Sequence, residues 1–213
     1  MIEYVNERMP QIGFAAWQHF SLVVQCLVLA TVIAVGLAAL CYRNRALTAA
    51  ANAVSAVGLT IPSFALIGLL IAPLGFGVAP AVVVVSFFAA LPILRNAVVG
   101  LAGIDRHLVE SARGIGMSRM RTLLRVELPM AWPVILTGVR VSAQMVMGIA
   151  AVAAYSLGPG LGGFIFSGLS RLGGANALNS VVVGVVGVVI LALILDLLLA
   201  GLGRLTTSRG LRA

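Results

Sequence analysis

Side chains able to perform chemistry are few in this chain and lie far apart. The 213 residues include six acids, two histidines and two cysteines, and all fourteen basic residues are arginines. Without lysine, the chain supplies neither the phosphate-reaching amine of a P-loop nor the amine of a Schiff base. Cys26 and Cys41 would lie about 22 Å apart on one helix, and no third thiol completes a metal site. We expect no catalytic residue, no metal site and no cofactor here.

The composition indicates an integral membrane protein. Apolar residues make up 61% of the chain and charged residues 9%, whereas a soluble domain carries about 25% charged residues. The net charge of +8 comes from arginines that flank apolar stretches, a pattern typical of membrane anchoring and not of nucleic-acid binding. Residues 1–17 lack the basic start and cleavage site of a signal peptide, so we expect the first apolar stretch to stay in the lipid.

Five stretches are long and apolar enough to cross about 30 Å of hydrocarbon as helices. We predict a single membrane domain over residues 1–213, with spans near 20–42, 48–72, 78–99, 132–157 and 180–202. The odd number of spans and the lack of an obvious repeat differ from secondary transporters built of related halves. One acid, Asp196, falls clearly inside a span, so the energy for transport is expected to come from another protein.

The distribution of arginines predicts an orientation. Twelve of them share one side of the membrane in a five-span chain, against Arg8 and Arg171 on the other. By the positive-inside rule, the polar segment 105–129 and the C-terminus are cytoplasmic and the N-terminus is outside. The twelve are Arg43, Arg45, Arg95, Arg106, Arg113, Arg119, Arg121, Arg125, Arg140, Arg204, Arg209 and Arg212.

The segment 105–129 is too polar to enter a bilayer, and it carries five of the fourteen arginines. Leu108, Ala112 and Ile115 recur at helical spacing and predict a short amphipathic helix. This segment is therefore where the membrane protein meets a soluble partner.

Glycines and a proline predict how this segment ends. Gly114 and Gly116 permit the chain to leave the short helix in a sharp turn. An arginine-rich stretch, 118–126, then leads to Pro129, which suits a helix start. The prediction is a helix, a turn and a second helix below the membrane.

The spacing in this segment resembles the EAA signature of bacterial ATP-binding cassette importer permeases. That signature reads Glu-Ala-Ala, three residues, Gly, nine residues, Ile, any residue, Leu-Pro; here Ser replaces one Ala, and Val replaces Ile. The matching residues are Glu110, Ser111, Ala112, Gly116, Val126, Leu128 and Pro129. The resemblance implies an all-α membrane protein with the type I importer permease fold, in which the short helix is a coupling helix.

The resemblance also implies partners. The coupling helix docks onto a separate ATPase subunit that binds ATP and Mg, so the permease itself is not an enzyme. A second permease subunit, identical or related, and an external substrate-binding protein complete the importer in the lipid of a bacterial cytoplasmic membrane. Glu110 can pair with Arg106 or Arg113 at helical spacing, or it can meet a residue of the ATPase.

Stretches outside the segment resemble the osmoprotectant permeases of this family. They include TIPSFALIGLLIAPLGFGVAPAVV and SLGPGLGGFIF, and they imply transport of glycine betaine, carnitine, choline or proline betaine. Quaternary ammonium groups bind aromatic faces, and the three Tyr and two Trp are scattered, so strong recognition is expected in the external binding protein. The alternative is an importer of methionine or another amino acid, and a different class is an ATP-independent channel or carrier.

Polar residues within the predicted spans are candidates to line the pathway. Pro62 removes a helical hydrogen bond, which membrane helices tolerate where neighbours or cavity water satisfy the freed carbonyl. Ser and Thr side chains can instead bond their own backbone, and an isolated Gln can bond a neighbouring helix. The candidates are Ser55, Thr60, Pro62, Ser63, Asn96 and Gln144.

Two opposite charges occupy similar depths in the last two predicted spans, which are antiparallel. Arg140 lies about eight residues from the inner end of its span, and Asp196 lies at a similar depth in the next. We expect a structural ion pair rather than a substrate site, which requires the two side chains to approach within salt-bridge distance. Between these spans, FIFSGLSRL predicts a short helix with glycine-rich flanks on the outer surface.

Overall fold

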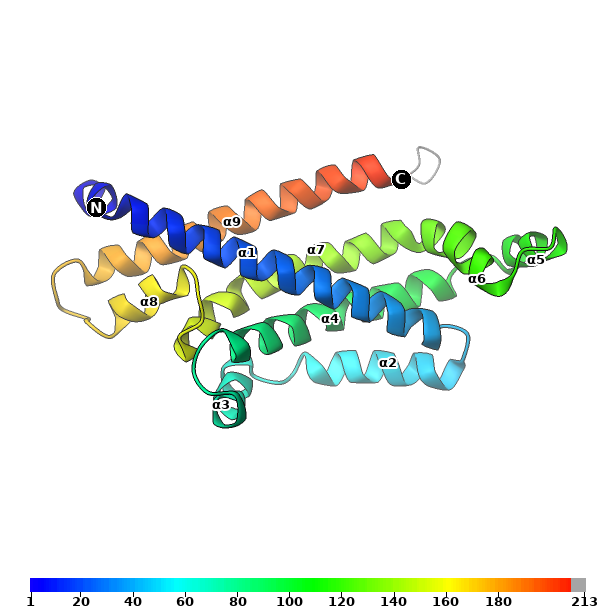
Figure 1. The fold of residues 1–213 in the computed structure, drawn as a ribbon, viewed down its shortest axis with the longest axis horizontal. Coiled ribbons are helices and arrows are strands. Elements are labelled where there is room, and N and C mark those ends of the chain that lie inside the picture. Colours follow the sequence, from blue (N-terminus) through cyan, green and yellow to red (C-terminus); the bar gives the residue numbers. More distant parts are fainter. Residues whose placement is uncertain (208–213) are drawn as a thin grey trace.

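The computed structural model describes residues 1–207. Arg209 and Arg212, counted in the predicted orientation, lie outside these described residues. The chain forms an elongated helical bundle (Figure 1). Its elements are α1 (Ile2–Cys41), α2 (Arg45–Gly58), α3 (Ser63–Leu74), α4 (Val78–Ala102), α5 (Arg106–Gly114), α6 (Arg119–Thr122), the π-helix η1 (Leu123–Glu127), α7 (Leu128–Ala153), the 3₁₀ turn η2 (Ala154–Ser156), α8 (Gly162–Leu169) and α9 (Ala177–Thr206).

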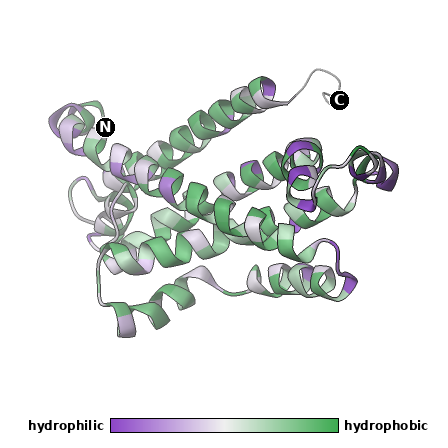
Figure 2. Cartoon of the chain, turned by 45° about the vertical axis from the view of Figure 1, so that its right-hand side comes forward, coloured by the Kyte–Doolittle hydropathy of each residue, from purple (hydrophilic) through white to green (hydrophobic). Residues whose placement is uncertain are grey.

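The two ends of the bundle differ in polarity from its middle. Figure 2 shows hydrophobic residues along the middle of the long helices and hydrophilic residues gathered near α5 and near the N-terminus. We call the end with α5 and α6 the loop end and the opposite end the α8 end. Within residues 1–207, four helical stretches are long and apolar enough to cross a membrane: α1, α4, the continuous stretch Arg119–Ser156, and α9. The pair α2–α3 is a fifth span if its two helices are counted together.

The predicted span at 48–72 consists of two helices, because the chain bends by 93° between α2 and α3. Pro62 has no N–H to donate to the carbonyl of Gly58, and the residue before a proline is driven out of the helical region. The Ile61 N–H donates to that carbonyl instead, at 3.3 Å. The chain then turns, and α3 starts directly after Pro62.

Two other predicted spans are shorter than the helices that contain them. The first was expected to begin near Phe20, but α1 begins at Ile2 and has 40 residues, which is about 60 Å at 1.5 Å per residue. The fourth was expected to begin near Trp132, but α7 continues from α6 through η1, so Arg119–Ser156 is one rod of 38 residues. The second helix of the polar segment is therefore an extension of a membrane span.

A π-helical turn accommodates Pro129 within this continuous helix. In a straight α-helix the proline ring would clash with the carbonyl of Arg125, four residues earlier. The chain widens over Leu123–Glu127 instead, and the Leu128 N–H donates to the carbonyl of Leu123, five residues back. Pro129 does lie in the first turn of α7, as its sequence position predicted, but the helix passes through that turn without a break.

Helices α4 and α7 form the centre of the bundle, and α1 crosses both of them. Small residues allow these helices to approach closely. A methyl group added at Gly138 of α7 would lie 2.7 Å from Cβ of Asn96 and 3.0 Å from the Pro92 carbonyl oxygen of α4. By contrast, α9 lies at the edge, with 11% of its most apolar window buried.

The short helix expected between the last two spans is α8, and it is held against α9. The Ser180 hydroxyl donates to the Phe164 carbonyl at 2.8 Å. A methyl group at Gly168 would lie 2.6 Å from the Ala177 carbonyl oxygen. The glycines near α8 thus serve close helix packing as well as turns.

Two glycines of α7 provide a matched test of this packing. We expect Gly138→Ala to lower the melting temperature of the purified protein, because the added methyl meets α4 and overpacking costs about 1–3 kcal/mol. Gly148→Ala serves as the control, since nothing lies within 4 Å of its added methyl. The melting temperature of both variants is measured by heating samples and quantifying the remaining folded protein by size-exclusion chromatography. Equal melting temperatures would contradict the close α4–α7 contact.

Candidate functional site

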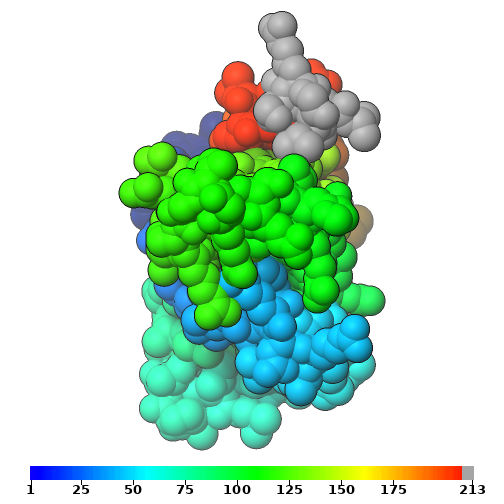
Figure 3. All heavy atoms as spheres, turned by 90° about the vertical axis from the view of Figure 1, so that its right-hand side faces the viewer, coloured from blue at the N-terminus to red at the C-terminus, as the bar shows by residue number. Residues whose placement is uncertain are grey.

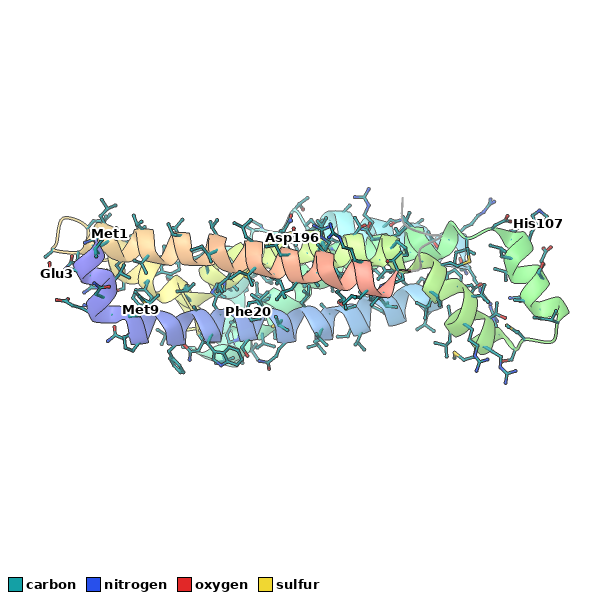
Figure 4. All side chains as sticks on the ribbon, turned by 90° about the horizontal axis from the view of Figure 1, so that it is seen from above. Met1, Glu3, Met9, Phe20, His107 and Asp196 are labelled. Carbon is teal, nitrogen blue, oxygen red and sulfur yellow. The ribbon has the colours of Figure 1, made fainter. Side chains whose placement is uncertain are left out.

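The signature residues begin on α5, which projects beyond the bundle at the loop end. Asp105 caps this helix, its carboxylate accepting a hydrogen bond from the His107 N–H at 2.9 Å, which satisfies an otherwise unpaired donor of the first turn. Figure 4 shows His107 at the far end of the molecule. Glu110 and Ser111 are exposed, whereas Ala112 is buried. The polar side chains of α5 are therefore exposed, while the small side chain of Ala112 is buried.

Gly116 ends α5 in a Schellman motif. The Gly116 N–H donates to the Arg113 carbonyl at 2.9 Å, and the Met117 N–H donates to the Ala112 carbonyl at 3.1 Å. This closure requires a left-handed residue, and Gly116 has φ of +85°, which glycine adopts without steric cost. The glycine of the signature is thus the residue that turns the chain from α5 into α6. Ser118 then caps α6 by accepting from the Arg121 N–H.

A cavity of about 750 Å³ separates α5 from the bundle. It is lined by the start of α2, the end of α4 and one face of α5, including Glu110, Arg106 and Arg113. Within the described chain, Glu110 forms no ion pair with either arginine. The pairing along the helix that we considered for Glu110 is therefore not formed, and its carboxylate faces the cavity with two cations nearby.

A buried carboxylate next to the signature joins the polar segment to α1. Glu127 is 2% exposed, and its carboxylate accepts from the Tyr42 hydroxyl at 2.5 Å and from Arg43 Nη2 at 3.0 Å. Burial, followed by the hydrogen bond to Glu127, raises the pKa of Tyr42 to about 12. We call these three side chains the Glu127 cluster.

Sequence reasoning missed the Glu127 cluster. Glu127 occupies the position of the signature that accepts any residue, and Arg43 was read only as an orientation charge. The available signal was a lone acid among apolar residues at the start of a span. The cluster connects the end of α1 to η1, at the base of the polar segment.

Comparison with known proteins identifies the family. Residues 30–207 match the family described as binding-protein-dependent transport system inner membrane component. The chain belongs to this family. It is thus the inner-membrane permease component of an ABC transporter, not itself an enzyme, and membership implies an ATPase and a binding protein as partners.

Several relatives match the permease over nearly its whole length. The carnitine transport permease protein OpuCB of Listeria monocytogenes is 33% identical, over 100% of this chain and 95% of the relative. The choline transport system permease protein OpuBB of Bacillus subtilis is 32% identical, with 100% and 96% covered. The osmoprotectant import permease protein OsmW of Salmonella typhimurium is 36% identical, with 99% of each chain covered.

A solved structure shares the fold of this permease. It is the inward-facing MetNI methionine ABC transporter, with a TM-score of 0.79 over 95% of this chain and 99% of that chain. The sequence identity is 22%, so this likeness shows the fold and no substrate. The all-helical importer permease fold expected from the signature is confirmed.

The polar residues expected to line a pathway fall in different places in the permease. Ser55 is fully buried inside the subunit, and its hydroxyl has no hydrogen-bond partner among residues 1–207. Asn96 donates to the Pro92 carbonyl of its own helix at 2.9 Å. The Thr60 hydroxyl donates to the carbonyl of Val57 at 2.7 Å. The candidates at the exposed α2–α3 break are Thr60, Pro62 and Ser63, whereas Ser55 does not reach the subunit surface.

Arg140 and Asp196 are in contact, as an ion pair requires. Arg140 donates from Nε and Nη2 to the two carboxylate oxygens at 3.0 and 2.9 Å, and Gln144 donates to the same carboxylate at 3.3 Å. The side chains are 41% and 24% exposed, and Asp196 lies near the middle of the molecule's length (Figure 4). The α7–α9 face thus carries a partly exposed ion pair within the membrane-spanning region.

Removing one side of the Glu127 cluster tests its role in stability. We expect Arg43→Gln to destabilise the permease by about 3–5 kcal/mol, because it leaves the carboxylate of Glu127 buried without a counter-charge. Arg125→Gln is the control, since this exposed arginine of the same segment loses an equal charge. The free energy of unfolding of both variants is measured in detergent, with tryptophan fluorescence as the signal. Similar stabilities of the two variants would show that the cluster does not anchor α1.

Proposed function

We propose that this chain is the permease subunit of an ATP-driven importer for an osmoprotectant such as glycine betaine, carnitine, choline or proline betaine. The observation that carries the proposal is the match of the whole chain to the carnitine, choline and osmoprotectant permeases, at 32% to 36% identity. A methionine importer is the alternative, but the methionine transporter supports only the fold at 22% identity.

In the proposed importer, two permease subunits, identical or related, enclose the pathway. Each α5 docks onto an ATPase subunit, which holds the ATP and Mg, and an external binding protein delivers the substrate at the α8 end. Closure of the ATPases on ATP draws the α5 helices together, and the pathway alternates between outward and inward openings. The residues assigned to coupling are those of the signature, from Glu110 to Pro129.

The proposed orientation places the loop end in the cytoplasm. Among the described arginines, those of the α1–α2 connection and of the polar segment gather at the loop end, whereas Arg8 and Arg171 lie toward the α8 end. Cytoplasmic ends of membrane helices carry such an excess. The N-terminus is then outside, which is also where α8 meets the binding protein.

Two features support a pathway along faces that the isolated subunit leaves open. Residues 59–62, between α2 and α3, are exposed, and an irregular backbone is tolerated at membrane depth only where protein or water covers it. The ion pair of Arg140 and Asp196 is partly exposed as well, and intramembrane charges face protein or water rather than lipid. We assign Thr60, Pro62, Ser63 and Gln144 to the pathway, and the ion pair to holding α9 against α7.

Reconstitution separates this function from that of a channel or carrier. Proteoliposomes containing the permease, its ATPase and the binding protein should accumulate labelled glycine betaine only when ATP is present. Uptake by the permease alone would establish an ATP-independent transporter. Calorimetry of the binding protein with betaine, choline, carnitine and methionine identifies the substrate, and exclusive binding of methionine would overturn the proposal.

Gly116 provides a test of coupling. Gly116→Ala forces a side chain into the left-handed region, at a cost of about 1–2 kcal/mol, and should shift α5 relative to the ATPase. We expect several-fold less substrate imported per ATP hydrolysed. Gly114→Ala is the matched control, because Gly114 is helical and nothing lies within 4 Å of its added methyl. If both variants transport like the wild type, the turn has no part in coupling.

A further inference from the structure

The cavity beneath α5 has the size of a ligand site. Its volume of about 750 Å³ falls within the range of about 300–1,000 Å³ typical of ligand pockets. Figure 3 looks onto the loop end, where the green atoms of α5 and α6 lie directly above the blue atoms of α2. Helix α5 packs mainly against α6 and η1. A ligand bound in the cavity would therefore influence the position of α5 relative to α2 and α4.

The charges that line the cavity are unbalanced. Arg43 and Glu127 neutralise each other, which leaves three arginines and one acid, Glu110. The guanidinium groups of these arginines have no hydrogen bond or ion pair within the described chain. An excess of two positive charges therefore faces the cavity, and guanidinium groups bind phosphate through paired N–H donors. The three are Arg45, Arg106 and Arg113.

A neutral polar group on the wall also lacks a partner. Asn52 lines the cavity, and its Oδ1 is buried and accepts no hydrogen bond within residues 1–207. On the same helix, Leu47, Val54 and Val57 are 46%, 60% and 65% exposed. At about 100° per residue these apolar residues lie on the opposite face of α2 from Arg45 and Asn52, so the polar face of α2 lines the cavity.

We propose that this cavity binds the headgroup of an anionic phospholipid such as phosphatidylglycerol. The phosphate lies among the unpaired arginines. The inference rests on the proposed orientation, which places this end at the inner leaflet, where basic pockets between membrane helices hold anionic headgroups. The bound lipid holds α5 at a fixed distance from the bundle.

Lipid retention tests this site in the complex of the permease with its ATPase. The double variant Arg45→Gln/Arg113→Gln removes cavity charge, and Arg119→Gln/Arg125→Gln removes equal charge from exposed positions of the polar segment outside the cavity. Each complex is exchanged from mixed phosphatidylglycerol–phosphatidylcholine vesicles into detergent, and the retained lipid is quantified by mass spectrometry. We expect the wild type and the exposed-site variant to retain phosphatidylglycerol preferentially and the cavity variant to retain at least fivefold less.

Equal retention by all three complexes would overturn the site, and equal loss in both double variants would show only general charge attraction. Arg45→Lys/Arg113→Lys, which keeps the charge, should recover part of the retention. Inorganic phosphate is the second probe: a thermal shift as large as that with short-chain phosphatidylglycerol, without preferential lipid retention, would overturn the lipid assignment in favour of a soluble phosphate.

Lipid retention tests the site independently of the proposed transport function, because it is measured without substrate or ATP. The orientation is tested independently by labelling a cysteine placed at His107 with a membrane-impermeant maleimide, in a variant lacking Cys41. Labelling of the position-107 cysteine from outside intact cells would overturn the placement of the cavity at the inner leaflet. Protection of this cysteine, together with loss of phosphatidylglycerol retention in the cavity variant, supports the site.

Discussion

A membrane-spanning chain has to satisfy its own backbone hydrogen bonds, and the prolines show how this fold does so. At Pro62 the helix stops, and a turn takes up the freed carbonyl. At Pro129 the helix widens by one residue and continues. At Pro92 the helix α4 continues without a break, although the carbonyl of Phe88 loses its helical donor; the adjacent Ala89 carbonyl accepts from the Ser142 hydroxyl of α7 at 2.7 Å. The bend of α2–α3 and the continuous α7 both follow from this one requirement.

The sequence predicted those features that depend on local patterns. Apolar length gave the helices α4 and α9 to within a few residues, and the helix and turn around Gly116 followed from short-range spacing. The contact of Arg140 with Asp196 was predictable because both charges lie at similar depths in antiparallel neighbours. Each inference needed little knowledge of how distant segments pack.

Features that arise from packing were not predictable in the same way. A proline predicts a disturbed helix, but the choice between a 93° bend and a π turn depends on what surrounds it. Glu127 looked like a variable position, since its partners, Tyr42 and Arg43, come from the end of a helix more than 80 residues earlier. The amphipathic stripe of α5 likewise did not reveal that a cavity lies on one side of it.

The continuous helix formed by α6, η1, α7 and η2 has a mechanical consequence. Its 38 residues run about 57 Å at 1.5 Å per residue, from the turn below α5 to the neighbourhood of α8. The Glu127 cluster ties one end to α1, and the ion pair at Arg140 braces the middle against α9. In the proposed importer, a rigid helix held in this way converts a small displacement of α5 into a tilt of its far end, near α8.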